Sequence, residues 1–171
     1  MLTGTILTVI RDHLIAQLPL NPAQCQIRPT GTPAAETLDQ CVTLRELGIA
    51  CEGRTFLREE YHLEVAIWRR GEDLPDDRAE QAIYAVDPVS PNAPTMEAWE
   101  HEIIRHLHGN DPDIRQVLNQ QFGPEGAYGE RFQLPLFYIG RGPTERVTLK
   151  PQATTWYVRR LKFTGLSRVV T

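Results

Sequence analysis

The fold is decided by a stretch that reads, from residue 61 to residue 68, Tyr-His-Leu-Glu-Val-Ala-Ile-Trp. Apolar side chains occupy every second position: Tyr61, Leu63, Val65 and Ile67. This is the period of a β-strand with one face against a core. The predicted strand runs from Phe56 to Arg70, and ten residues of it would span about 33 Å. A strand of that length is long enough to project beyond a compact domain.

A second strand is predicted from Cys41 to Cys51. Its apolar residues alternate up to Leu44 and resume at Leu47 on the opposite parity. Such a change of parity is typical of a β-bulge, which we expect between Glu46 and Gly48. We expect this strand to pair with the long one as an antiparallel hairpin.

An amphipathic helix is predicted over residues 3 to 18. Its apolar stripe recurs at spacings of three and four, and consists of Ile6, Leu7, Ile10, Leu14, Ile15 and Leu18. Either Thr3 or Thr5 is placed to cap its start, and Pro19 follows its end. We expect this helix to pack on the sheet.

A central helix is predicted from Thr95 to His108, with Thr95 as its N-cap. Glu97 and Glu100 lie in its positive first turns, and its buried stripe consists of Met96, Trp99, Ile103 and Leu107. Asp111-Pro112 then predicts the start of a further helix that ends near Gln121. The apolar face of this further helix consists of Ile114, Val117 and Leu118.

The remaining strands are predicted at residues 24–29, 132–139, 146–149 and 154–166. Pro135 assigns the second of these to a sheet edge, and Gly140-Arg-Gly-Pro is interpreted as a turn. The predicted fold is therefore a single α+β domain over residues 1–171. Its mainly antiparallel sheet is flanked by the N-terminal helix and by one or two central helices, and it has long loops. Residues 71–94 form an acidic, loop-rich insertion.

The composition is that of a globular protein, with 41% hydrophobic and 23% charged residues. No apolar stretch reaches the roughly 18 residues that a membrane helix needs. The start of the chain lacks the features of a secretory signal, so we expect the host cytoplasm as the place of synthesis. The three cysteines, Cys25, Cys41 and Cys51, include no C-x-x-C pair, and we expect them to be buried thiols.

The charges are sorted along the chain. Residues 72–130 contain 13 acidic and 3 basic residues, whereas residues 131–171 contain 8 basic residues and one acidic residue. Two segments of opposite charge suit a protein whose partner is another copy of itself or a neighbouring subunit.

The motifs of common enzymes are not met. His101 and His106 are five residues apart, so they do not share a helix face as the histidines of a zinc protease do. The glycines at 123, 126 and 129 lack the lysine of a phosphate loop. We therefore expect no catalytic residue, no metal ligand and no cofactor. Direct contact with nucleic acid is disfavoured because the net charge of the chain is −4.

The order of these elements resembles that of the tail terminator, or tail-completion, proteins of long-tailed bacteriophages. The resemblance covers nearly the whole chain and ends in the strand that contains Trp156-Tyr-Val-Arg-Arg-Leu-Lys-Phe. It implies a structural virion protein, not an enzyme, which forms a hexameric ring on the tail tube and joins the tail to the head. The implied partners are further copies of the chain, the tail tube protein and the head–tail connector or adaptor protein, with no membrane.

A ring of copies joined head to tail needs unlike faces on each subunit. The charge segments suggest which residues lie at such an interface: Arg146, Arg159, Arg160 and Lys162 on the basic side, and Asp76, Asp77, Glu97 and Glu100 on the acidic side. Whether the two segments meet within one subunit or between subunits stays open. The alternatives are another head–tail connector or neck protein, a small cytoplasmic binding module, and a small hydrolase.

Overall fold

The computed structural model describes residues 3–18, 20–37, 39–52, 58–71, 95–108, 114, 116–118, 136–151 and 153–168. Its helices are α1 (Thr3–Gln17), the short 3₁₀ helix η1 (Pro22–Gln24) and α3 (Met96–His108). Its strands are β1 (Cys25–Ile27), β2 (Gln40–Glu52), β3 (Arg58–Arg70), β4 (Phe137–Arg141), β5 (Glu145–Leu149) and β6 (Thr154–Arg168).

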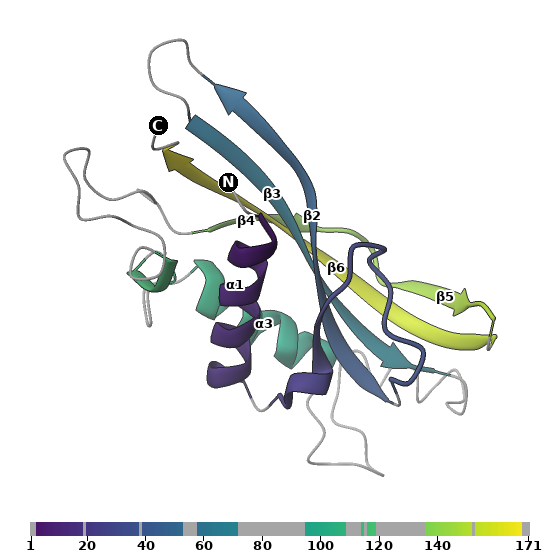
Figure 1. Ribbon diagram of the computed structural model, residues 1–171. Coiled ribbons are helices and arrows are strands. Elements are labelled where there is room, and N and C mark those ends of the chain that lie inside the picture. Colours follow the sequence, from purple (N-terminus) through teal and green to yellow (C-terminus); the bar gives the residue numbers. More distant parts are fainter. Residues whose placement is uncertain are drawn as a thin grey trace.

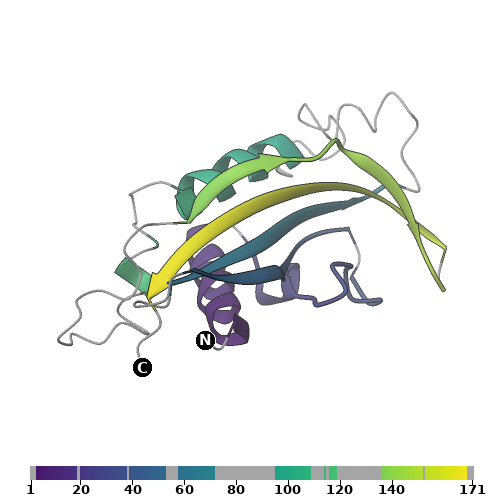
Figure 2. The ribbon, with the colours of Figure 1, turned by 90° about the horizontal axis from the view of Figure 1, so that it is seen from above.

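The six strands form one sheet in the order β1-β2-β3-β6-β4, and β5 also pairs with β6. Only β1 and β2 are parallel, and the other pairs are antiparallel. Figure 1 shows α1 and α3 together on one side of this sheet. Seen from above, β4 and β5 follow one another along the same side of the curved strand β6 (Figure 2). The prediction of an α+β fold with a mainly antiparallel sheet is confirmed.

The predicted hairpin is present as the pair β2 and β3, each of 13 residues. Their register pairs Glu46 with Leu63 and Gly48 with His62, so that Leu47 is left over as the extra residue of a bulge. This register confirms the predicted bulge. The apolar pattern changes parity there because β2 has one extra residue.

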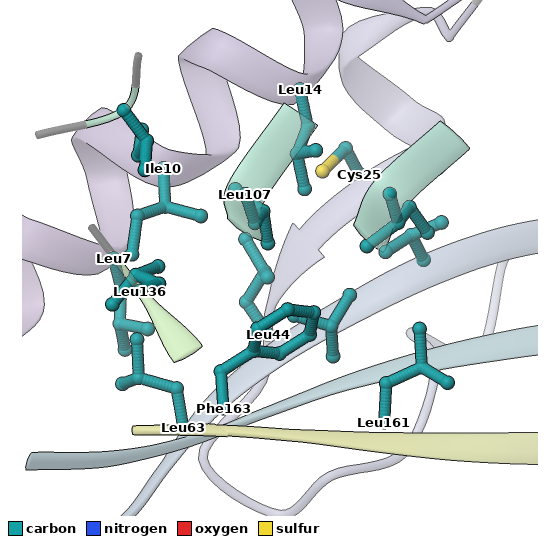
Figure 3. Close-up of a cluster of buried hydrophobic side chains, with 14 of the residues drawn as sticks. Leu7, Ile10, Leu14, Cys25, Leu44, Leu63, Leu107, Leu136, Leu161 and Phe163 are labelled. Carbon is teal, nitrogen blue, oxygen red and sulfur yellow. The ribbon is translucent and has the colours of Figure 1, made fainter. Parts of the chain in front are cut away.

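The main core lies between the helices and one face of the sheet. Leu7, Ile10 and Leu14 of α1 point toward the sheet, where Leu63 and Phe163 meet them (Figure 3). The whole apolar stripe of α3, from Met96 to Leu107, is buried in the same cluster. The alternation along β3 therefore identified the face that the helices cover.

The opposite face of the sheet carries a second, smaller core. Trp68 and Trp156 meet edge to face there, with their ring centroids 6.3 Å apart, and Cys41, Ala66 and Val158 complete the buried cluster. The indole Nε1 of Trp68 donates a hydrogen bond to Oγ1 of Thr43 over 2.9 Å. Both faces of the central strands are therefore buried over part of their length.

The helix predictions hold where the structure describes them. Backbone N of Ala98 donates to Oγ1 of Thr95 over 3.0 Å, which confirms the predicted cap. Ile114 and Leu118 of the further predicted helix are buried in the main core. Residues 111–113, 115 and 119–121 of that helix, the insertion at 72–94 and the side chains of Thr3 and Thr5 lie outside the described residues.

The interpretation of Gly140-Arg-Gly-Pro as a turn is wrong at its start. Gly140 and Arg141 belong to β4 and pair with Lys162 and Leu161 of β6. Ile139 is the extra residue of a second bulge, and Gly140 beside it has a φ of 152°, which residues with side chains rarely adopt. The glycine therefore serves a bulge inside the strand. The predicted edge strand begins only at Phe137, and residues 132–135 lie outside the described part.

The close contact between Gly165 and Tyr61 gives a test of the core. A Cβ at Gly165 would lie 2.3 Å from Cζ of the buried Tyr61 ring, so Gly165→Ala forces the ring to shift. We expect this variant to lose about 1–3 kcal/mol of unfolding free energy in denaturant titrations. Gly48→Ala is the matched control, because a Cβ there meets nothing within 4 Å. Equal losses in the two variants would contradict the contact.

Candidate assembly surface

The residues predicted at a subunit interface lie in different environments. Arg159 is only 1% exposed and lies on the face of the sheet that the helices cover, next to Leu161 and Ile67. Arg159 is therefore buried within its own subunit, although the sequence suggested it as an interface residue. Consecutive side chains of a strand point to opposite faces, so the side chain of Arg160 lies on the face of the sheet away from the helices. Asp76 and Asp77 lie outside the described residues.

An ion cluster holds Arg159 against helix α3. Nη1 of Arg159 donates to Oε2 of Glu100, and its Nε donates to Oγ1 of Thr144 over 3.1 Å. Nε of Arg141, on β4, lies 2.8 Å from Oε1 of the same Glu100. Two guanidinium groups thus share one carboxylate that is itself 12% exposed. At this point the acidic and basic segments meet within one subunit.

A second ion cluster lies on the other face of the sheet. Glu64, 3% exposed, accepts hydrogen bonds from Nε and Nη2 of Arg45 at 2.8 and 3.0 Å, and from Nη1 of Arg160 at 2.8 Å. The guanidinium of Arg160 lies over the Trp68 ring, 5.1 Å from its centroid, and approaches the carbonyl oxygen of Gly31 at 3.4 Å. Arg160 thus joins the strands to the segment before β2.

Three of the predicted interface residues remain on the surface. Lys162 and Arg146 are exposed on β6 and β5, and Glu97 is exposed in the first turn of α3. Arg146 lies over the ring of Tyr157 at 6.0 Å from its centroid. These three side chains are available to a neighbouring subunit, whereas Glu100, Arg159 and Arg160 are already engaged within their own.

The sequence pattern did not single out the two large apolar side chains that are most exposed. Leu47 is 42% exposed and Ile139 is 58% exposed. Each is the extra residue of a bulge, Leu47 in β2 and Ile139 in β4. The change of parity at Leu47 was a signal for the first of them. The run Phe137-Tyr-Ile139 contains no such change, so the second could not be found from the sequence.

The histidines are scattered over the described residues. Nε2 of His62 lies 3.4 Å from Oε1 of Glu60, and Nε2 of His106 lies 3.4 Å from Oε2 of Glu102, while His101 is exposed. No group of three potential metal ligands occurs among the residues that the structure describes. A hollow of about 480 Å³ lies beside η1 and is lined by Gln26, Arg28 and Thr37, away from all three histidines.

Two of the cysteines are buried thiols, as expected. Burial raises the pKa of Cys25 and that of Cys41 to about 12. At neutral pH these thiols are therefore protonated and weakly reactive. The side chain of Cys51 lies outside the described residues.

A buried pair of histidines joins α1 to α3. The rings of His13 and His106 meet edge to face with centroids 6.3 Å apart, and His13 is 7% exposed. Burial lowers the pKa of His13 below 6.5, and the nearby His106 lowers it further. The neighbouring carboxylate in this contact is Glu102, close to His106.

This pair predicts a loss of stability in mild acid. Because the pKa of His13 is lower in the folded chain than in the unfolded one, the unfolded state takes up more protons as the pH falls below 6.5. The unfolding free energy should therefore decrease from pH 7.5 to pH 5, by at most about 1.4 kcal/mol per pH unit from this one group. His13→Leu should reduce the slope in urea titrations at several pH values, and an unchanged slope would contradict the assignment.

Among the described residues, no helix is both long and apolar enough to cross a membrane. A scan against protein-family models finds no match for the chain. A search of curated proteins finds no match either.

Proposed function

We propose that this protein is a structural subunit of a bacteriophage virion, which caps the tail tube as a closed ring of identical copies, a hexamer, and joins the tail to the head connector. The observation that carries the proposal is the long sheet. Strands β2, β3 and β6 contain 13, 13 and 15 residues, and they extend past the helices in Figure 1. A subunit of a ring needs such extended edges and surfaces to reach its neighbours.

The projecting part is a three-stranded arm formed by residues 48–52, 58–62 and 164–168. Its strands pair continuously from His62 and Thr164 to Arg58 and Arg168. The pairing of β1 with β2 ends at Leu44, and that of β4 with β6 ends at Thr164. Among the described residues, no further strand pairs with either side of this arm. Open strand edges are a route to pairing with another chain.

The ion clusters also support a rigid building block. Glu64 and Glu100 each join two arginines across different elements, so that β2, β3, β6, β4 and α3 are tied together by buried charge. Such clusters favour one arrangement because any other leaves a charge buried without a partner. A unit that docks to the tail tube on one side and to the connector on the other benefits from a fixed shape.

A neighbouring head–tail connector protein is the second candidate. The chain is longer than compact tail terminators, and the excess lies in residues 71–94 and 123–129. The position along the virion axis separates the two candidates. Genes for a portal, a tail tube or a sheath beside the gene for this chain would support either candidate.

The position is tested by mixing the purified protein with tail tubes assembled from the tube protein of the same genome. Negative-stain electron microscopy should show an added ring at one end of each tube. Tubes incubated with the protein before further tube subunits are added should not grow at that end. If the rings do not bind the tubes and bind only the isolated connector, the protein is a connector protein and not a tail terminator.

A further inference from the structure

The two bulges lie at the same level of the sheet, on opposite edges. Glu46 pairs with Leu63, Leu63 pairs with Phe163, and Phe163 pairs with Tyr138. The next residue on each outer strand is the extra one of its bulge, Leu47 on β2 and Ile139 on β4. These are also the two exposed large apolar side chains of the described residues.

Both edges are open at this level. On one edge, β1 pairs with β2 only as far as Leu44. On the other edge, β4 is the outermost strand among the described residues. Backbone N of Tyr138 is already used, because it donates to Nδ1 of His108 over 3.0 Å. The free segments are therefore Glu46–Gly48 on β2 and Ile139–Arg141 on β4.

The directions of these two strands suit a repeat of the same chain. β2 is antiparallel to β3, β3 to β6, and β6 to β4, so β2 and β4 run in opposite directions. When two copies stand side by side in the same orientation, β2 of one copy meets β4 of the next as an antiparallel pair. Such a contact is head to tail, which is the kind that generates rings.

One register of this pair gives a favourable partner at three successive positions. With Glu46 opposite Arg141, the next pairs are Leu47 opposite Gly140 and Gly48 opposite Ile139. Each exposed apolar side chain then faces a glycine. A Cβ at Gly48 or at Gly140 would meet nothing within 4 Å, so there is room beside both glycines for the partner's side chain.

The charges agree with this register. Glu46 and Arg141 pair with Leu63 and Leu161, which belong to the core under the helices, so both charged side chains belong to the helix side of the sheet. Glu46 is exposed, and Arg141 is 38% exposed although its Nε contacts Oε1 of Glu100 in its own subunit. Opposite charges that face each other across two strands contribute roughly 0.2–1 kcal/mol.

Bulges often protect a sheet edge against pairing, and protective edges usually present lysine or another charge. Here the extra residues are leucine and isoleucine, so these edges lack that protection.

We propose that residues 46–48 of β2 and residues 139–141 of β4 bind each other between neighbouring copies, with Glu46 opposite Arg141. The inference rests on the proposed ring and specifies which two edges join in it.

Disulfide trapping tests the register. Glu46→Cys and Arg141→Cys are made separately, both with Cys51→Ser so that Cys51 cannot form a competing disulfide. Cys25 and Cys41 can stay, because they are buried and protonated. Directly opposite residues bring Cβ atoms close enough for a disulfide. A mixture of the two variants should give covalent dimers on mild oxidation, and one chain carrying both changes should give a ladder up to the full ring.

The controls separate this contact from others. Glu46→Cys mixed with Thr148→Cys, an exposed position on β5 of the same sheet edge, should give no dimer. Dimers from Glu46→Cys alone would show a symmetric contact and overturn the proposal. A ring in native mass spectra without cross-links in the mixture would also overturn it, while leaving the proposed function in place. The absence of both ring and cross-link would count against both.

Hydrogen exchange on the unmodified protein provides a second measurement that needs no variant. Backbone amides of residues 46–48 and 139–141 should exchange more slowly at concentrations where the ring forms than in dilute monomer. We expect at least a tenfold difference in rate at both segments. Equal exchange in ring and monomer at both segments would overturn the proposal.

Discussion

Glu100→Ala is expected to lower the free energy of unfolding by about 3–5 kcal/mol, the range for a buried ion pair that loses one partner. The carboxylate of Glu100 forms an ion pair with Arg159, whose side chain is 1% exposed. Without it, the guanidinium loses the ion pair with Glu100 and keeps its hydrogen bond to Thr144. Denaturant titration followed by circular dichroism measures the loss.

Two further variants show whether charge is the cause. Glu97→Ala, on the same helix but exposed, should change the stability by less than about 0.5 kcal/mol. Adding Arg159→Leu to Glu100→Ala should restore part of the loss, because the buried guanidinium that faced Glu100 is then removed as well. If the double variant is less stable than Glu100→Ala, the arginine is stabilising for another reason and the account of this cluster is wrong.

Leu47→Lys and Ile139→Lys should each leave the subunit folded and abolish most of its assembly. Both side chains are exposed in the monomer, so the substitutions disturb no core. In the proposed ring each lysine would bury a charge at a subunit contact. We expect the concentration at half-assembly to rise at least tenfold for either variant, which corresponds to about 1.4 kcal/mol per contact.

Gln116→Lys is the matched control for these two variants. It adds the same charge at an exposed helical position that belongs to neither strand, and it should assemble as the unchanged chain does. Analytical ultracentrifugation over a concentration series compares the three. Normal assembly of Leu47→Lys and Ile139→Lys would exclude the two sheet edges as the contact, whatever the oligomeric state.

The strands and the main core could be predicted because local periodicity carries the information. Alternation around Leu63 assigned one face of β3 to the core, and the change of parity after Leu44 located a bulge that the register confirms at Leu47. Hydrophobic side chains follow the period of the element to which they belong, so their pattern needs no knowledge of distant partners.

The burial of Arg159 could not be predicted in the same way. Its carboxylate partner, Glu100, lies 59 residues earlier in the chain, and only the packing of α3 on β6 brings the two together. A basic residue followed directly by a second one, Arg160, looks exposed when the strand is considered alone. The second core around Trp68 was missed for a related reason, since it depends on which strands pair with β6 near Trp156.

The mass of the unmodified protein in native conditions tests the central claim most directly. The account predicts one main species at about six times the chain mass of 19.4 kDa, seen as a ring with a central opening in electron micrographs. A single species at 19.4 kDa at every concentration, also in the presence of the tail tube protein, would contradict it.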